Sequence, residues 1–140
     1  MSISNIFNIA GSALVAETAR LTTSASNLSN ANVETGNKEE VYKVQYPIFK
    51  SAQESANRWM NEVHSGGVRL KGTYVSQAEP IQHYQPNNPM ADKDGFVYSP
   101  NVSYVEEMAN VISAAKSYQM NVELVSNAKV LIQRTLQLGE

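Results

Sequence analysis

The stretch that predicts most about the fold is Ser103–Gly139, SYVEEMANVISAAKSYQMNVELVSNAKVLIQRTLQLG. Its large apolar residues recur in alternating steps of four and three, which is the spacing of a heptad seam on one face of a helix. Ser103 and Glu106 fit a capping box at the start, and Gly139 stands where the helix should stop. We therefore expect a long helix that packs against a second one. The seam comprises Tyr104, Met108, Val111, Ala115, Tyr118, Val122, Val125, Ile132 and Leu136, with an irregularity at Ala128–Lys129.

A second heptad pattern occupies the first third of the chain. Large residues stand at every seventh position, and smaller apolar residues fill the steps of three and four between them. Across Ser24–Asn32 the pattern runs through Ser and Asn, which are weak helix formers because their side chains compete for backbone hydrogen bonds. Such a helix is marginal alone, so we expect it to depend on packing. The stripe contains Ile3, Phe7, Ala10, Leu14, Leu21, Ala25, Leu28 and Ala31.

The N-terminal segment has very little charge. Within residues 1–33 the only charged side chains are Glu17 and Arg20. A helix face that meets water normally carries more, whereas the outer positions here are Ser, Thr, Asn, Ala and Gly. Small uncharged residues permit close helix contacts, and an uncharged surface is typical of an interface. The composition therefore favours packing between subunits over an ordinary core face.

The middle of the chain differs in composition. All five prolines lie between residues 34 and 100. Tyr42–Tyr46 alternates with a period of two, and so does Val68–Lys71 after a Gly-Gly turn, so both segments predict strands; whether the second continues past Gly72 to Tyr74 and Val75 is left open. Residues 81–101 are rich in Pro and Asn and predict irregular structure. The pattern of Ala56, Trp59, Met60 and Val63 leaves a short amphipathic helix and a loop equally open.

These segments define an expected architecture. The fold is mainly α with a small β-rich insert, and it is elongated. We expect an N-terminal core helix in residues 1–35, a β-rich or irregular middle in residues 36–100, and a C-terminal core helix in residues 101–140. The insert returns the chain, so that the two terminal helices can pair as an antiparallel coiled coil.

Candidate chemistry is sparse. The chain has no cysteine and a net charge of −2, and its Lys and Arg are scattered, so we expect no thiolate chemistry and no nucleic-acid partner. His64 and His83 have no second ligand at helical spacing and are expected in solvated loops. Asp92–Gly95 predicts a turn and lacks the acids of a calcium loop. Glu106 and Glu107 suit the first turn of a helix. We expect no catalytic residue, metal or cofactor, and hence no enzyme.

Membrane and export signals are equally weak. No segment approaches the roughly 20 apolar residues of a membrane span. The N-terminal residues lack the basic region that precedes the apolar part of a secretory signal. We therefore expect no membrane span and no cleaved signal peptide.

Two segments resemble the signatures of the bacterial flagellar rod, hook and hook-associated proteins. SNLSNANVETG is similar to N-L-A-N-A-N-T-x-G, with matches at Asn27, Leu28, Asn30, Ala31, Asn32 and Gly36. NVSYVEEMANVISAAKSYQMN is similar to N-V-x-x-V-x-E-M-x-x-M-I-x-A-x-R-x-Y-x-A-N. Lys116 stands where that family usually has Arg, and it keeps the charge but not the bidentate geometry. The C-terminal matches are Asn101, Val102, Val105, Glu107, Met108, Ile112, Ala114, Tyr118 and Asn121.

A third segment narrows the resemblance. NNPMADKDGFVYSPNV, from Asn87 to Val102, is similar to a run found in one subfamily, the proximal-rod proteins. Matches include Asn88, Asp92 and Gly95, and Phe96 replaces the usual Tyr. The resemblance covers both ends of the chain and is weakest from Ser51 to Gln85.

The resemblance implies a structural role without catalysis. Such proteins cross the flagellar type III export apparatus unfolded, without a cleaved signal. They polymerise through their terminal helices into a helical axial tube that transmits torque in the periplasmic part of the basal body. The implied partners are copies of the chain and other flagellar rod proteins, with Ser and Asn bonding across subunits. The expected assembly interface is Ile3, Phe7, Leu14, Leu21, Asn27, Leu28, Asn30, Asn32, Met108, Val111, Ile112, Ala115, Tyr118, Asn121, Val122, Val125, Ile132 and Leu136.

One other class fits the same helices. A secretion-associated coiled-coil adaptor that forms a small oligomer would also pair two heptad helices. A closed oligomer repeats one interface, whereas a helical assembly needs several distinct contacts. The low charge of residues 1–33 favours the assembly.

Overall fold

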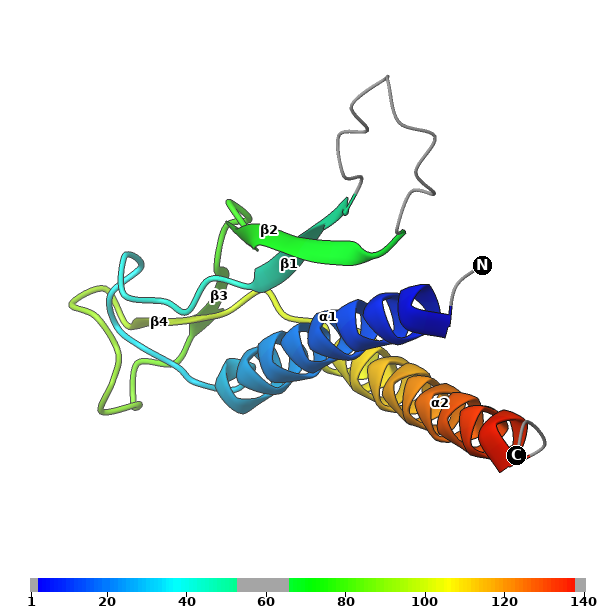
Figure 1. Ribbon diagram of the computed structural model, residues 1–140. Helices are drawn as coiled ribbons and strands as arrows, with labels where there is room; N and C mark the ends of the chain where they lie inside the picture. Colours follow the sequence, from blue (N-terminus) through cyan, green and yellow to red (C-terminus); the bar gives the residue numbers. More distant parts are fainter. Residues whose placement is uncertain (1–2, 53–65, 138–140) are drawn as a thin grey trace, which may run out of the picture.

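The structure is a computed structural model that describes residues 3–52 and 66–137. It is mainly helical with a small β-rich insert, as the sequence predicts. The two helices run antiparallel, both chain ends lie at the same end of an elongated molecule, and the strands lie beside α1 and beyond its far end (Figure 1). The possible helix around Ala56–Val63 lies outside the described residues. The order is α1 (Ile3–Asn30), β1 (Gln45–Ser51), β2 (Val68–Val75), β3 (Ile81–Tyr84), β4 (Phe96–Ser99) and α2 (Tyr104–Gln137).

The start of α2 has the predicted cap. The Glu106 backbone N–H donates to the Ser103 hydroxyl oxygen at 3.4 Å, and the Glu107 N–H donates to the Ser103 carbonyl at 3.0 Å. Glu106 and Glu107 lie in the first turn and Arg134 in the last, which suits the helix dipole at both ends.

The first pair of strands agrees only in part with the sequence pattern. β1 and β2 are antiparallel, from Gln45 opposite Val75 to Ser51 opposite Val68, with a bulge after Ile48. β2 begins at the predicted Val68 and includes the extension to Val75 that the pattern left open, but β1 begins three residues after the predicted start at Tyr42. The alternation that begins at Tyr42 has a different cause, because the Tyr42 hydroxyl bonds to α1 and the Val44 side chain is buried.

The prediction of irregular structure across residues 81–101 is wrong for Ile81–Tyr84 and Phe96–Ser99, which are strands, and is confirmed for the residues between them. β3 and β4 pair antiparallel, from Ile81 opposite Ser99 to Tyr84 opposite Phe96. Each strand has only four residues, too few for a clear alternation, and the Pro- and Asn-rich residues between them form the connection. Tertiary contacts stabilise the pair, because Val97 is fully buried and Tyr98 bonds to Thr35 in both directions, at 2.8 and 3.0 Å. His83 lies exposed on β3 and not in a loop.

Candidate assembly surface

Small residues form the contact between the two helices. On α2 the buried residues are Glu107, Ala114 and Ala128, spaced at sevens, and Asn121 on the same line is half-buried. On the α1 side Ala10, Ser24 and Ala31 are buried at the same spacing, with Glu17 half-buried between them. This seam differs from the predicted apolar seam on α2. It is rotated by one residue, because small side chains allow two helix backbones to approach closely and large ones do not.

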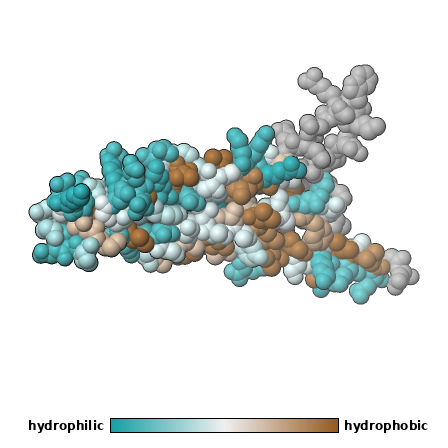
Figure 2. Space-filling model, turned by 90° about the vertical axis from the view of Figure 1, so that its left-hand side faces the viewer, coloured by the Kyte–Doolittle hydropathy of each residue, from teal (hydrophilic) through white to brown (hydrophobic). Residues whose placement is uncertain are grey.

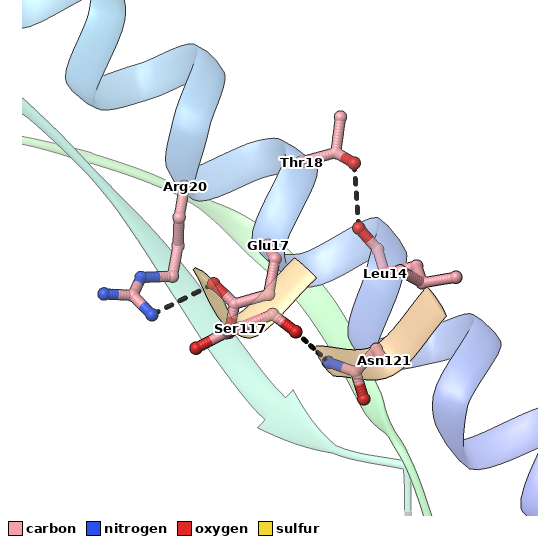
Figure 3. Close-up of polar contacts among 6 residues, drawn as sticks. All are labelled: Leu14, Glu17, Thr18, Arg20, Ser117 and Asn121. Carbon is pink, nitrogen blue, oxygen red and sulfur yellow. Dashed lines mark hydrogen bonds and ion pairs between the residues drawn. The ribbon is translucent and has the colours of Figure 1, made fainter. Parts of the chain in front are cut away.

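Polar residues occupy the middle of this seam. Glu17 and Arg20 of α1 form an ion pair of 3.0 Å, and Figure 3 draws this pair together with Ser117 and Asn121 of α2. The Asn121 amide donates to the Ser117 carbonyl at 2.8 Å. An antiparallel register that sets Glu17 opposite Asn121 also sets Ala10 opposite Ala128, Ser24 opposite Ala114 and Ala31 opposite Glu107. The last six of these residues are buried, so the burial agrees with the register.

Large apolar side chains of α2 remain exposed around much of the helix. Most of the predicted α2 interface is among them, while Val111, Asn121, Val125 and Ile132 are half-buried. On the face shown in Figure 2, apolar side chains gather toward the right-hand side, and the left-hand side is mainly hydrophilic. Soluble monomers rarely expose so much contiguous apolar surface, so α2 offers area for a partner. The exposed residues are Tyr104, Val105, Met108, Ile112, Tyr118, Met120, Val122, Leu124, Val130, Leu131 and Leu136, and Ala115 is exposed too.

The predicted α1 residues lie in a different setting. Ile3 is the first residue of α1, and Asn32 is exposed beyond its end. Asn30 is half-buried and donates to the Ser26 carbonyl of its own helix at 2.8 Å. Phe7, Leu14, Leu21 and Leu28 are half-buried, so each still has surface to offer.

Asn27 has a role inside the subunit that the sequence pattern does not predict. Its side chain is fully buried. The amide group donates to the Gln45 carbonyl at 2.9 Å, and the side-chain oxygen accepts from the Gln45 N–H at 3.0 Å and the Tyr42 hydroxyl at 2.9 Å. Asn27 therefore fastens α1 to the first residue of β1. Its hydrogen bonds, expected across subunits, are made within the chain, and a lone Asn in a heptad pattern carries no signal for such a contact.

The N-terminal signature, which ends at Gly36, and the middle signature, Asn87–Val102, meet in one junction. Thr35 pairs with Tyr98 of β4, and the Asn88 amide donates to the Glu34 carboxylate at 3.1 Å. A Cβ on Gly36 would collide with the Met90 backbone oxygen, so this position needs glycine for close approach. These contacts explain why the two motifs occur together in one chain.

Asp92 organises the turn predicted at Asp92–Gly95. One carboxylate oxygen accepts from the Phe96 N–H at 2.8 Å and the Asp94 N–H at 2.9 Å, and the other accepts from the Tyr98 hydroxyl at 3.1 Å. The Phe96 bond, the largest cause, and the Tyr98 bond hold the pKa of Asp92 below its ordinary value. The same bond to Asp92 raises the pKa of Tyr98. Gly95, at φ 82°, completes the turn.

Glu107 is the one buried acid of the helix seam. It is 3% exposed, and its Oε2 has no hydrogen-bond partner among residues 3–52 and 66–137. Burial, and then the charges of Glu107 and Glu106, raise the pKa of the Tyr46 phenol of β1. Glu107 is thus a buried acid in the first turn of α2.

No group of three or more potential metal ligands occurs among residues 3–52 and 66–137. None of the described helices is long and apolar enough to cross a membrane. The surfaces that stand out are apolar and extended, and such surfaces bind other proteins.

Comparisons with known proteins agree with the resemblance seen in the N-terminal and C-terminal signatures. The family "Flagellar basal body rod FlgEFG protein C-terminal" matches residues 93–138. Over the full length of both chains, the sequence is 40% identical to flagellar basal-body rod protein FlgC of Salmonella typhimurium, 42% identical to that of Escherichia coli O157:H7, and 39% identical to that of Buchnera aphidicola from Acyrthosiphon pisum. The chain belongs to the FlgC family of flagellar basal-body rod proteins.

Proposed function

We propose that the chain is a structural subunit of the bacterial flagellar basal-body rod. The observation that carries the proposal is the exposed apolar surface of α2, which persists although one face of the helix already packs on α1. A monomer gains nothing from exposing residues such as Val105 and Ile112, whereas a subunit buries them in its neighbours. The 40% identity to a flagellar basal-body rod protein over the full length of both chains supports the same role.

The finer proposal is that α1 and α2 polymerise into the helical tube of the proximal rod, which transmits torque. The partners are copies of the chain and other rod proteins. The chain itself is exported by the flagellar type III export apparatus without a cleaved signal. Export in this way delivers the subunit to the periplasmic part of the basal body. The role requires no catalysis, metal or cofactor. The interface comprises the residues predicted on α1 and α2, with the Asn27 side chain serving inside the subunit.

Deletion and complementation in the source bacterium test this role. We expect a strain without the chain to be non-motile, and a plasmid copy to restore motility and to appear in purified basal bodies. Recovery of the chain only as a small soluble oligomer, with motility intact after deletion, would support the adaptor class instead.

A matched pair of substitutions on α2 tests the surface. Ile112→Asp places a charge on an exposed apolar position and should prevent incorporation into basal bodies. Ser113→Asp adds the same charge to the neighbouring exposed polar position and should be tolerated better. Equal incorporation of the two variants would contradict an interface at Ile112.

A further inference from the structure

A groove of about 600 Å³ lies between α1, the β1–β2 pair and α2. Val15, Thr18 and Thr22 line it from α1, Pro47 from β1, Leu70 from β2 and Tyr118 from α2. Among the described residues, no charged side chain lines it. The groove therefore joins both core helices to the middle segment in one uncharged surface.

The groove is more apolar than its sequence indicates. The Thr18 hydroxyl donates to the Leu14 carbonyl at 2.8 Å, and the Thr22 hydroxyl donates to the Thr18 carbonyl at 2.9 Å (Figure 3 shows the first bond). Thr23 bonds in the same way to Ala19 at 2.8 Å. Since the hydroxyls are used within the helix, the threonines need no polar partner from outside. A charged occupant would lose its hydration without compensation, so the groove selects uncharged, apolar side chains.

The same chain carries a surface with that chemistry. Tyr104, Val105, Met108 and Ile112 lie within the first three turns of α2, and we call them the α2 patch. Val105 is 78% exposed and Ile112 63% exposed, which places them among the most exposed large apolar side chains described. No member of the patch is charged. Along α1, by contrast, the exposed positions outside the groove are mostly Ser, Asn and Ala, which are too small to fill it.

We propose that the groove of one copy receives the α2 patch of a second copy. The inference rests on the proposed function, because it requires copies to meet in an assembly. Groove and patch are different surfaces of the molecule, so a head-to-tail contact leaves one of each free at the two ends of a pair. The contact therefore continues from copy to copy.

Cysteine cross-linking tests the contact cleanly, because the chain has no cysteine of its own. Thr22→Cys marks the groove and Ile112→Cys marks the patch. The two variants are co-expressed as separate chains, so that any cross-link between the two positions joins two copies, and purified basal bodies are treated with a short bis-maleimide. We expect a dimer from co-expressed single variants and a ladder of multimers from the double variant.

Thr135→Cys supplies the matched control for the groove. Thr135 is also exposed, and its hydroxyl makes the same kind of bond, to the Leu131 carbonyl at 2.8 Å, but it lies outside the groove. Co-expressed with Ile112→Cys, it should give little cross-linked dimer. If Thr22→Cys fails to assemble, Thr23→Cys reports on the same groove.

The outcomes separate the two proposals. Absence of the unmodified chain from basal bodies would overturn the proposed function. Its presence without a Thr22–Ile112 cross-link, or with equal cross-linking of the Thr135 control, would overturn the groove contact alone. Cross-linking of Thr22→Cys to a protein of different mass would show another rod protein in the groove and would also overturn it.

Discussion

Replacement of Asn27 by Ala should weaken the junction between α1 and β1 and lower the free energy of unfolding. The fully buried side chain makes three hydrogen bonds, two to the Gln45 backbone and one to the Tyr42 hydroxyl. An intramolecular hydrogen bond contributes about 1 kcal/mol net, and a buried group left without a partner costs about 1–3 kcal/mol. Tyr42 keeps a contact to the Ser26 hydroxyl at 3.1 Å, which limits its loss. We therefore expect a loss of about 3 kcal/mol.

Urea unfolding followed by circular dichroism measures this loss. In a thermal scan the same change should lower the midpoint by about 10 °C for a chain of this size. Asn30→Ala is the matched control, because Asn30 bonds only to its own helix, at the Ser26 carbonyl. It should change the free energy of unfolding by less than about 0.5 kcal/mol. Equal effects of the two substitutions would refute the assignment of Asn27 as the link between α1 and β1.

Three further predictions follow from single positions. Ala114→Leu should destabilise the fold by about 1–3 kcal/mol because Ala114 is fully buried, whereas Ala115→Leu should be nearly neutral because Ala115 is exposed. A larger loss of stability for Ala115→Leu than for Ala114→Leu would instead support the apolar seam predicted on α2. Gly11→Ala should stabilise α1 by about 1 kcal/mol, since its Cβ meets nothing within 4 Å, whereas Gly36→Ala should lower the melting temperature because of the collision with Met90. The pKa of Asp92 is lower in the folded chain than its ordinary value of 3.8, so its contribution to stability is complete above that value and is lost as pH falls through the folded pKa. Acid titration of Asp92→Asn should therefore show a smaller loss of stability below about pH 4 than the parent chain, and an unchanged acid limb would contradict the turn geometry.

The helices were predictable because each carries a repeat sustained over many turns. The face by which the helices meet was not predictable. The pattern of large residues identifies the most apolar side of α2, whereas close approach of the two helices buries Ala114 and Ala128, which lie one position away from that pattern. Large side chains such as Ile112 then remain on the outside. The heptad pattern therefore identified an apolar side of α2, and it did not identify the small residues that are buried on α2.

The β segments show a second limit. β2 has a clear alternation and begins at the predicted Val68, but β3 and β4 are too short to show a period. Their pairing depends on contacts distant in sequence, such as Thr35 with Tyr98. The role of Asn27 was likewise invisible, because its partner Gln45 is 18 residues away. The signature motifs located this junction without revealing its geometry.

The buried residues of both helices repeat at sevens, so the larger polar members of the repeat decide how the helices align along their axes. A slide of one heptad from the register given above would set Ala10 opposite Asn121 and Ser24 opposite Glu107, in place of Ala128 and Ala114. Glu17 on α1, and Glu107 and Asn121 on α2, therefore distinguish one alignment from the next. Polar positions in an otherwise uniform interface commonly fix register at some loss of stability. Exchanging these few residues for alanine would thus leave a pair of helices free to settle in more than one alignment.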